Sequence, residues 1–341
     1  MKKIITLIAT IMGIISHSIA FADPWYTGPL LLTPAEITPL GDVNFEVSLG
    51  EMNSNGIYQQ HFDLVSTPRN SSDQVNTQLI YGLADDVEVQ INAGYMRNQN
   101  HGQSYSGLND TLVVLGLGLQ SQGESSSKSD ITLQLGELFP TGRYEHLNSA
   151  RYTTDATGGG SYVSSIGLSV QHLISFAEER YLNLYGNATL AASSKVRLKG
   201  LNAYGGTEIT DGTITPGNWI TFDLAAEYLF AKNWGVVMET YIAAQQASTF
   251  KGKFASLPAF IREEGNLRRR RIIFNRIKPS HFNIGNQQNL GHGNVAQFTL
   301  APAVEYNISG NLGLIGGAWF SVVGKNIPEF FCGMLTLNMT W

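Results

Sequence analysis

Residues 219–230 read WITFDLAAEYLF, and apolar and polar side chains alternate along most of this stretch. In an extended chain Ile220, Phe222 and Leu224 fall on one face, whereas Asp223 and Glu227 fall on the other. A period of two residues indicates a β-strand between two different environments, because a helix would repeat every three to four residues. The stretch also exceeds the usual five or six residues of a strand in a globular sheet. A strand of this length, tilted, is long enough to cross a membrane.

The same alternation recurs along the chain in twelve segments. They lie near residues 41–51, 74–82, 87–95, 111–120, 130–138, 161–173, 181–191, 218–230, 235–244, 295–307, 312–322 and 330–341. The connections alternate between long ones (52–73, 97–110, 139–160, 192–217, 245–294) and short ones (83–86, 121–129, 174–180, 231–234, 308–311), and only the last outer loop, 323–329, is short. Long extracellular loops and short periplasmic turns are typical of outer-membrane barrels. Residues 41–341 therefore predict an all-β, transmembrane, antiparallel up-and-down β-barrel of about twelve strands.

Composition agrees with this class. Only 14% of the 341 residues are charged and the formal net charge is -5, which argues against a coiled coil and a nucleic-acid partner. Cys332 is the one cysteine, so the chain has no intrachain disulfide and no Cys-rich metal site.

Two segments precede the first predicted strand. Residues 1–22 combine Lys2 and Lys3, an apolar run and an Ala-Phe-Ala ending, which predicts a cleaved signal peptide and export to the cell outer membrane. A membrane anchor is disfavoured, since His17 and Ser18 interrupt the run. The leader, residues 23–40, holds four prolines, which predict an extended segment. It either enters the periplasmic mouth as a plug or lies along the barrel base.

The lumen is predicted to be acidic. Because a charge facing lipid at the membrane centre costs about 2–4 kcal/mol, the apolar face of each strand must point outward. The acids expected on inward positions are Glu46, Glu88, Asp223, Glu227, Glu239 and Glu305. They either hydrate the lumen or give it a preference for cations.

The outer loop near 245–294 is basic, with Arg268, Arg269, Arg270 and Arg271 in succession. It is either a solvated surface, a clamp on lipopolysaccharide and other outer-membrane lipid phosphates, or a segment that folds against the acidic lumen. At the other end of the barrel, the last strand ends in the aromatic Trp341. This ending resembles the signal that the barrel assembly machinery recognises.

The chain also resembles a family of outer-membrane barrel transporters named for the MetA pathway of phenol degradation. The resemblance covers most of the mature chain. It is carried by DPWYTGPLLLTPAEITPLGDVNFEVSL (23–49), YGLADDVEVQINAGY (81–95), GLNDTLVVLGLGL (107–119) and FPTGRY (139–144). It implies a twelve-stranded barrel and passage of small, aromatic or apolar compounds, and it supplies no binding residues.

No catalytic pattern accompanies these features. The sequence has neither a G-x-S-x-G elbow nor an H-E-x-x-H metal motif, so we expect no enzyme activity, no metal and no cofactor. Twelve strands lie between filled eight-stranded barrels and open sixteen-stranded porins, which predicts a narrow or plugged bore. The expected function is passive passage of a small-molecule solute. The alternative is a closed structural or surface-interaction barrel whose long loops bind an external partner.

Overall fold

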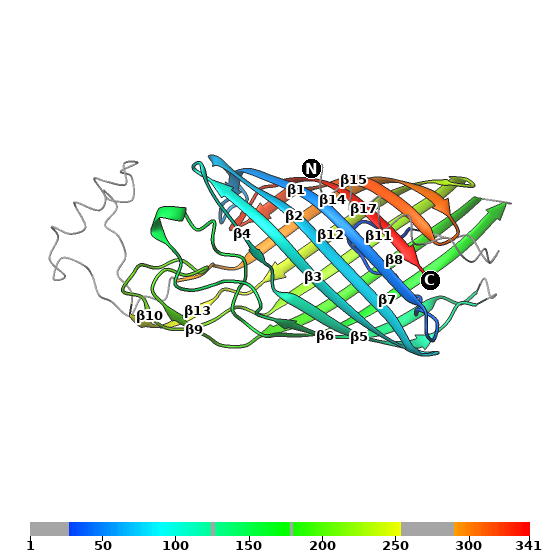
Figure 1. The fold of residues 1–341 in the computed structure, drawn as a ribbon, viewed down its shortest axis with the longest axis horizontal. Helices are drawn as coiled ribbons and strands as arrows, with labels where there is room; N and C mark the ends of the chain where they lie inside the picture. Colours follow the sequence, from blue (N-terminus) through cyan, green and yellow to red (C-terminus); the bar gives the residue numbers. More distant parts are fainter. Residues whose placement is uncertain (1–26, 124–126, 178–179, 254–289) are drawn as a thin grey trace.

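The computed structural model describes residues 27–123, 127–177, 180–253 and 290–341. Most of them form one closed barrel of antiparallel strands (Figure 1). The barrel strands are β1 (Val43–Tyr58), β2 (Leu64–Ala84), β3 (Val87–Asn100), β5 (Thr111–Gln120), β6 (Asp130–Phe139), β7 (Val163–Ala177), β8 (Arg180–Ser193), β11 (Trp219–Ala231), β12 (Trp234–Gln245), β14 (Val295–Ser309), β15 (Leu312–Lys325) and β17 (Phe331–Thr340). Each pairs with its neighbours along the chain, and β1 pairs with both β2 and β17, which closes the sheet. The predicted twelve-stranded up-and-down barrel is confirmed.

The barrel wall separates apolar from polar side chains as its alternating sequence predicts. On β11, Phe222, Leu224 and Tyr228 are exposed on the outer face, whereas Asp223 and Glu227 are buried on the inner face. Other exposed apolar side chains include Leu79, Ile91, Leu168, Leu184, Met238, Ile242, Val304 and Leu335. Hydrocarbon can cover such a face, because every strand of a closed barrel pairs its backbone with two neighbours.

The two ends of the barrel differ in the length of their connections. At one end, two-residue turns at 85–86, 232–233 and 310–311 join consecutive strands. The C-terminal Trp341 lies at this end, since its backbone exchanges hydrogen bonds with Val43 at the start of β1. Short turns face the periplasm in outer-membrane barrels. We therefore name this the periplasmic end and the opposite one the extracellular end.

The extracellular end has more strand structure than the sequence predicts. The predicted loop 52–73 is wrong, because β1 and β2 continue as a paired hairpin that leaves only residues 59–63 as a loop. The sequence does not alternate between apolar and polar residues in this hairpin, because polar residues occupy both faces of its arms. Examples are Asn53-Ser54-Asn55 in one arm and Asn70-Ser71-Ser72 in the other. In the same way, β4 (Gln103–Leu108) folds back on β3 within the predicted loop 97–110.

A separate three-stranded sheet also lies where loops were predicted. It consists of β9 (Val196–Lys199), β10 (Asp211–Thr215) and β13 (Thr249–Lys253), and Figure 1 shows it beyond the barrel end opposite the C-terminus. Val196, Leu198, Ile214, Phe250 and Leu290 form its core. Strands of four or five residues offer too few alternating positions for the period to be recognised.

Candidate functional site

Acidic side chains on inward positions of the wall lie away from any buried basic side chain in the part of the chain that the structure describes. Glu88, Asp223, Glu227, Glu239 and Glu305 are buried on inward positions, and Glu46 is half-buried on its inward position. Within the part of the chain that the structure describes, no Lys or Arg side chain is buried. The ion pairs there lie at the extracellular end: Arg143–Asp155 and His146–Glu145 in the loop between β6 and β7, and Arg197–Asp211 on the small sheet. The lumen acids must therefore find other partners.

Many of those partners come from the leader, whose residues 27–40 cross the barrel interior. Prolines prevent the leader from joining the sheet, so its N–H groups need side-chain acceptors. Leu31 and Leu32 donate to Oε2 and Oε1 of Glu239 at 3.0 and 2.7 Å. Further along, Ala35 donates to Gln171 at 3.0 Å and Thr38 donates to Glu88 at 2.9 Å. These acceptors lie on β12, β7 and β3, which are separated by other strands around the barrel, so the leader spans the lumen.

Apolar contacts reinforce the position of the leader. Leu30 is 5% exposed and packs against Val237, Ala301 and Ile315 of the inner wall. Leu32 packs in the same way against Tyr185 and Ala225. The leader therefore adds bulky apolar side chains to the lumen, where they pack against both small and large side chains of the wall.

The end of the leader approaches the wall very closely at Gly82. Leu40 forms a parallel bridge with Gly82 of β2. A Cβ atom at this position would lie 1.9 Å from the carbonyl oxygen of Pro39 and 2.5 Å from that of Thr38. Only glycine leaves room for the leader backbone here.

An aromatic cluster lies in the lumen on the extracellular side of the leader. Trp319 lies 4.7 Å from Phe330 and 6.5 Å from Tyr241, measured between ring centroids, and both contacts are edge-to-face. Its indole Nε1 donates to Oγ1 of Thr299 at 2.8 Å. Trp319 also packs on the apolar cluster that contains Leu30. Our sequence reasoning missed this cluster, although Tyr241 and Trp319 occupy inward positions of β12 and β15.

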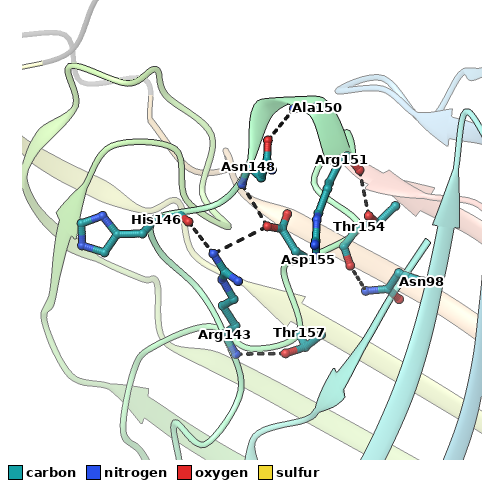
Figure 2. Close-up of polar contacts among 9 residues, drawn as sticks. All are labelled: Asn98, Arg143, His146, Asn148, Ala150, Arg151, Thr154, Asp155 and Thr157. Carbon is teal, nitrogen blue, oxygen red and sulfur yellow. Dashed lines mark hydrogen bonds and ion pairs between the residues drawn. The ribbon is translucent and has the colours of Figure 1, made fainter. Parts of the chain in front are cut away.

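The extracellular loop between β6 and β7 is fixed by a buried carboxylate. Figure 2 shows Asp155 beside Arg143 and the N-terminus of the 3-10 turn η1 (Ser149–Arg151). Asp155 is 0% exposed, accepts from the backbone N–H of Asn148 at 2.9 Å and lies 3.8 Å from the Arg143 guanidinium. Asn98 of β3 donates to the carbonyl oxygens of Thr154 and Ala156, both at 3.0 Å. The loop is thereby attached to the barrel rim.

A second carboxylate, that of Asp110, also holds this loop, and Tyr204 links the loop to the connection between β9 and β10. Asp110 accepts from the backbone N–H groups of Gly142 and Gly159 at 2.9 and 2.7 Å. The hydroxyl of Tyr204 donates to the carbonyl oxygen of Gly159 at 2.6 Å. Burial, and to a lesser degree nearby Asp110, raise the pKa of Tyr204 to about 12. The hydroxyl therefore stays protonated and able to donate at neutral pH.

The signal peptide 1–22 and the basic run Arg268, Arg269, Arg270 and Arg271 lie outside the described residues. Lys251 and Lys253, at the start of the basic loop, are exposed on β13. Within the described ranges, no group of three or more His, Cys, Asp or Glu side chains is arranged to hold a metal ion.

A closed twelve-stranded barrel with an apolar outer belt and short turns at one end defines an outer-membrane β-barrel protein. The chain is similar in fold to the COG4313 outer-membrane channel from Pseudomonas putida F1, with a TM-score of 0.61 and 12% sequence identity over 93% of this chain and 100% of that chain. The NanC porin (TM-score 0.42, 8% identity, 86% of this chain and 98% of that chain) and the CymD monoaromatic hydrocarbon channel (TM-score 0.34, 7% identity, 89% of this chain and 88% of that chain) match less well. No known family profile and no curated protein matches the sequence. The similarity extends to the fold, and the barrel that the family resemblance implied is confirmed.

Proposed function

We propose that this protein is an outer-membrane channel that lets small molecules diffuse through a narrow acidic lumen, plugged in part by the leader. One observation carries the proposal: a separate segment fills the lumen, whereas small barrels are filled by side chains of their own wall. Leu30 and Leu32 occupy space that Ala225, Ala301 and Ala303 leave free. A displacement of one segment would open a path without any change in the barrel wall.

The ions that pass are expected to be cations. The lumen acids have no buried Lys or Arg opposite them among the described residues, so the field inside is negative or neutral and never positive. A planar bilayer with a salt gradient across it tests this. A reversal potential that indicates higher permeability to cations than to anions supports the proposal. An anion-selective current would contradict it.

The solutes are small and aromatic or apolar. Trp319, Phe330 and Tyr241 present edges and faces on which a flat ring can pack, and Leu31 and Met334 adjoin the same apolar cluster. The polar wall beside them holds the hydroxyl of Thr299, which already orients the Trp319 indole. This combination suits a ring that carries one polar group.

The second candidate is a closed structural or surface-interaction barrel whose extracellular loops bind an external partner. The leader that fills the lumen and the anchored loop around Asp155 favour it. Bilayer recordings separate the two functions. A protein that stays silent both with and without its leader is a scaffold, whereas any stepwise current identifies a channel.

The export route and the membrane partners complete the proposal. Residues 1–22 are removed as a signal peptide, the barrel assembly machinery reads the last strand up to Trp341, and the run Arg268–Arg271 binds lipopolysaccharide phosphates. The protein acts without enzyme activity or cofactor. Amino-terminal sequencing of protein from outer membranes should begin at Asp23, and a start at Met1 would reject the cleavage.

A further inference from the structure

Two glutamate side chains meet at the start of the leader. Glu227 on β11 and Glu305 on β14 are both 0% exposed, and their carboxyl groups lie close enough to interact directly. Strand β12 separates β11 from β14, and Gly235 of β12 lies directly opposite Glu305. A Cβ atom at Gly235 would lie 2.7 Å from both Cγ and Oε1 of Glu305. The missing side chain therefore lets Glu305 reach across β12 toward Glu227.

Each carboxyl group uses one oxygen in a hydrogen bond and keeps the other free. The hydroxyl of Tyr185 donates to Oε2 of Glu227, and Asn307 donates to Oε1 of Glu305 at 3.0 Å. Oε1 of Glu227 and Oε2 of Glu305 are buried without a donor. Since no described Lys or Arg side chain is buried, no cationic side chain is available to neutralise these two oxygens.

A third acceptor lies beside them. Asn183 on β8 is directly opposite Glu227 in the sheet and is 0% exposed. Its Nδ2 donates to the hydroxyl of Tyr185 at 2.7 Å, which in turn donates to Glu227, so the direction of this chain fixes the amide orientation. Oδ1 of Asn183 is then left buried without a donor.

We propose that Glu227, Glu305 and Asn183 form a calcium-binding site inside the barrel. Two adjacent carboxylates cannot both be ionised in a buried place unless a cation lies between them. Carboxylate and amide oxygens are the ligands that Ca²⁺ prefers, water completes its shell, and two negative charges match a divalent ion.

The bound ion would fix the start of the leader. The hydroxyl of Thr27 donates to Oδ1 of Asn307 at 2.9 Å, and Nδ2 of Asn307 in turn donates to Glu305. This role goes beyond the proposed channel activity, because it concerns a stationary ion and the leader rather than a permeant solute.

Calorimetric titration of CaCl2 into the intact, chelator-treated protein in detergent tests the site. We expect one Ca²⁺ per chain, and affinity lowered by about tenfold or more in Glu305→Gln and in Gly235→Ala, where the new methyl group displaces Glu305 without removing a carboxylate. Glu51→Gln, at an exposed acid on β1, is the matched control and should bind as the wild type does.

Two results would overturn the site. One is a wild-type protein that takes up no Ca²⁺, as expected if the two carboxyl groups merely share a proton. The other is undiminished affinity in folded Gly235→Ala. Because the titration records no current, it can succeed where the channel proposal fails, and the reverse is equally possible.

Discussion

The carboxylate of Glu239 accepts a hydrogen bond from the backbone N–H of Leu32 at 2.7 Å, so a strand of the barrel wall holds the leader directly. The second oxygen of the same group accepts from Leu31 at 3.0 Å. Glu239 is 0% exposed, and water cannot replace either bond. The position of the leader therefore depends on lumen side chains and not on a backbone ladder.

Replacing this acceptor should loosen the leader. In Glu239→Gln one carboxylate oxygen becomes an amide nitrogen, which cannot accept from Leu31 or Leu32 and sets two donors against each other. The loss of one buried hydrogen bond costs about 1–3 kcal/mol, which shifts the equilibrium between the plugged and the open lumen by roughly fivefold to a hundredfold. Single-channel recordings should show more frequent openings than in the wild type. Glu51→Gln should leave the openings unchanged, and an unaltered record for Glu239→Gln would refute the role of this contact.

The aromatic cluster should govern the interaction with the solute. Phenol added to the bilayer chamber is expected to occupy the cluster briefly and reduce the ion current in a dose-dependent way. Trp319→Leu removes an aromatic surface on which phenol can pack, and one such ring contact contributes about 0.5–1.5 kcal/mol, so the block should weaken by roughly twofold to tenfold. The control is Trp234→Leu, at an exposed position of β12 near the periplasmic end. Equal block in the two variants would exclude the cluster as the solute site.

The anchored extracellular loop should open when its buried carboxylate is removed. Asp155→Ala leaves the N–H of Asn148 without its acceptor and removes the ion pair with Arg143, at a cost of about 1–3 kcal/mol. Trypsin should then cut at Arg143 or Arg151 several times faster. The Arg197–Asp211 pair offers a comparison, because both side chains are about 60% exposed and such pairs contribute only about 0–1 kcal/mol. Asp211→Asn should leave the cleavage rate as it is, and resistance of Asp155→Ala would contradict this account of the loop.

A charged side chain on the outer belt should destabilise the barrel more near the membrane centre than near its surface. Leu224 lies midway along β11 on the lipid-facing side, whereas Phe230 lies on the same side near the periplasmic turn. Leu224→Arg is expected to lower the free energy of unfolding in phospholipid vesicles by about 2–4 kcal/mol, and Phe230→Arg by about 1 kcal/mol or less from charge alone. Denaturant titration measures both. Equal losses at the two positions would mean that the belt does not face hydrocarbon as described.

Local periodicity was enough to predict the barrel wall. The alternation in residues 219–230 assigns every side chain of β11 to a face, and the structure keeps Asp223 inside and Leu224 outside. A one-residue error in register would reverse both, so the pattern is strongly constrained. Glu88, Glu239 and Glu305 are buried on alternating positions of their strands for the same reason.

The contacts inside the lumen could not be predicted in this way. The leader has no period, and its path depends on acceptors such as Gln171 and Glu88 that lie far away in sequence. The reach of Glu305 across Gly235 depends on the order of strands around the barrel, which local patterns do not encode. The small sheet was not predicted for another reason: its strands are too short to show alternation.

The central claim is that the leader, and not the wall, blocks the lumen. Single-channel conductance of a variant lacking residues 27–38, with its barrel verified by circular dichroism and heat-modifiable gel mobility, tests this most directly. We predict a conductance several times that of the wild type in the same salt. A correctly folded deletion variant with wild-type conductance, or with none, would contradict it.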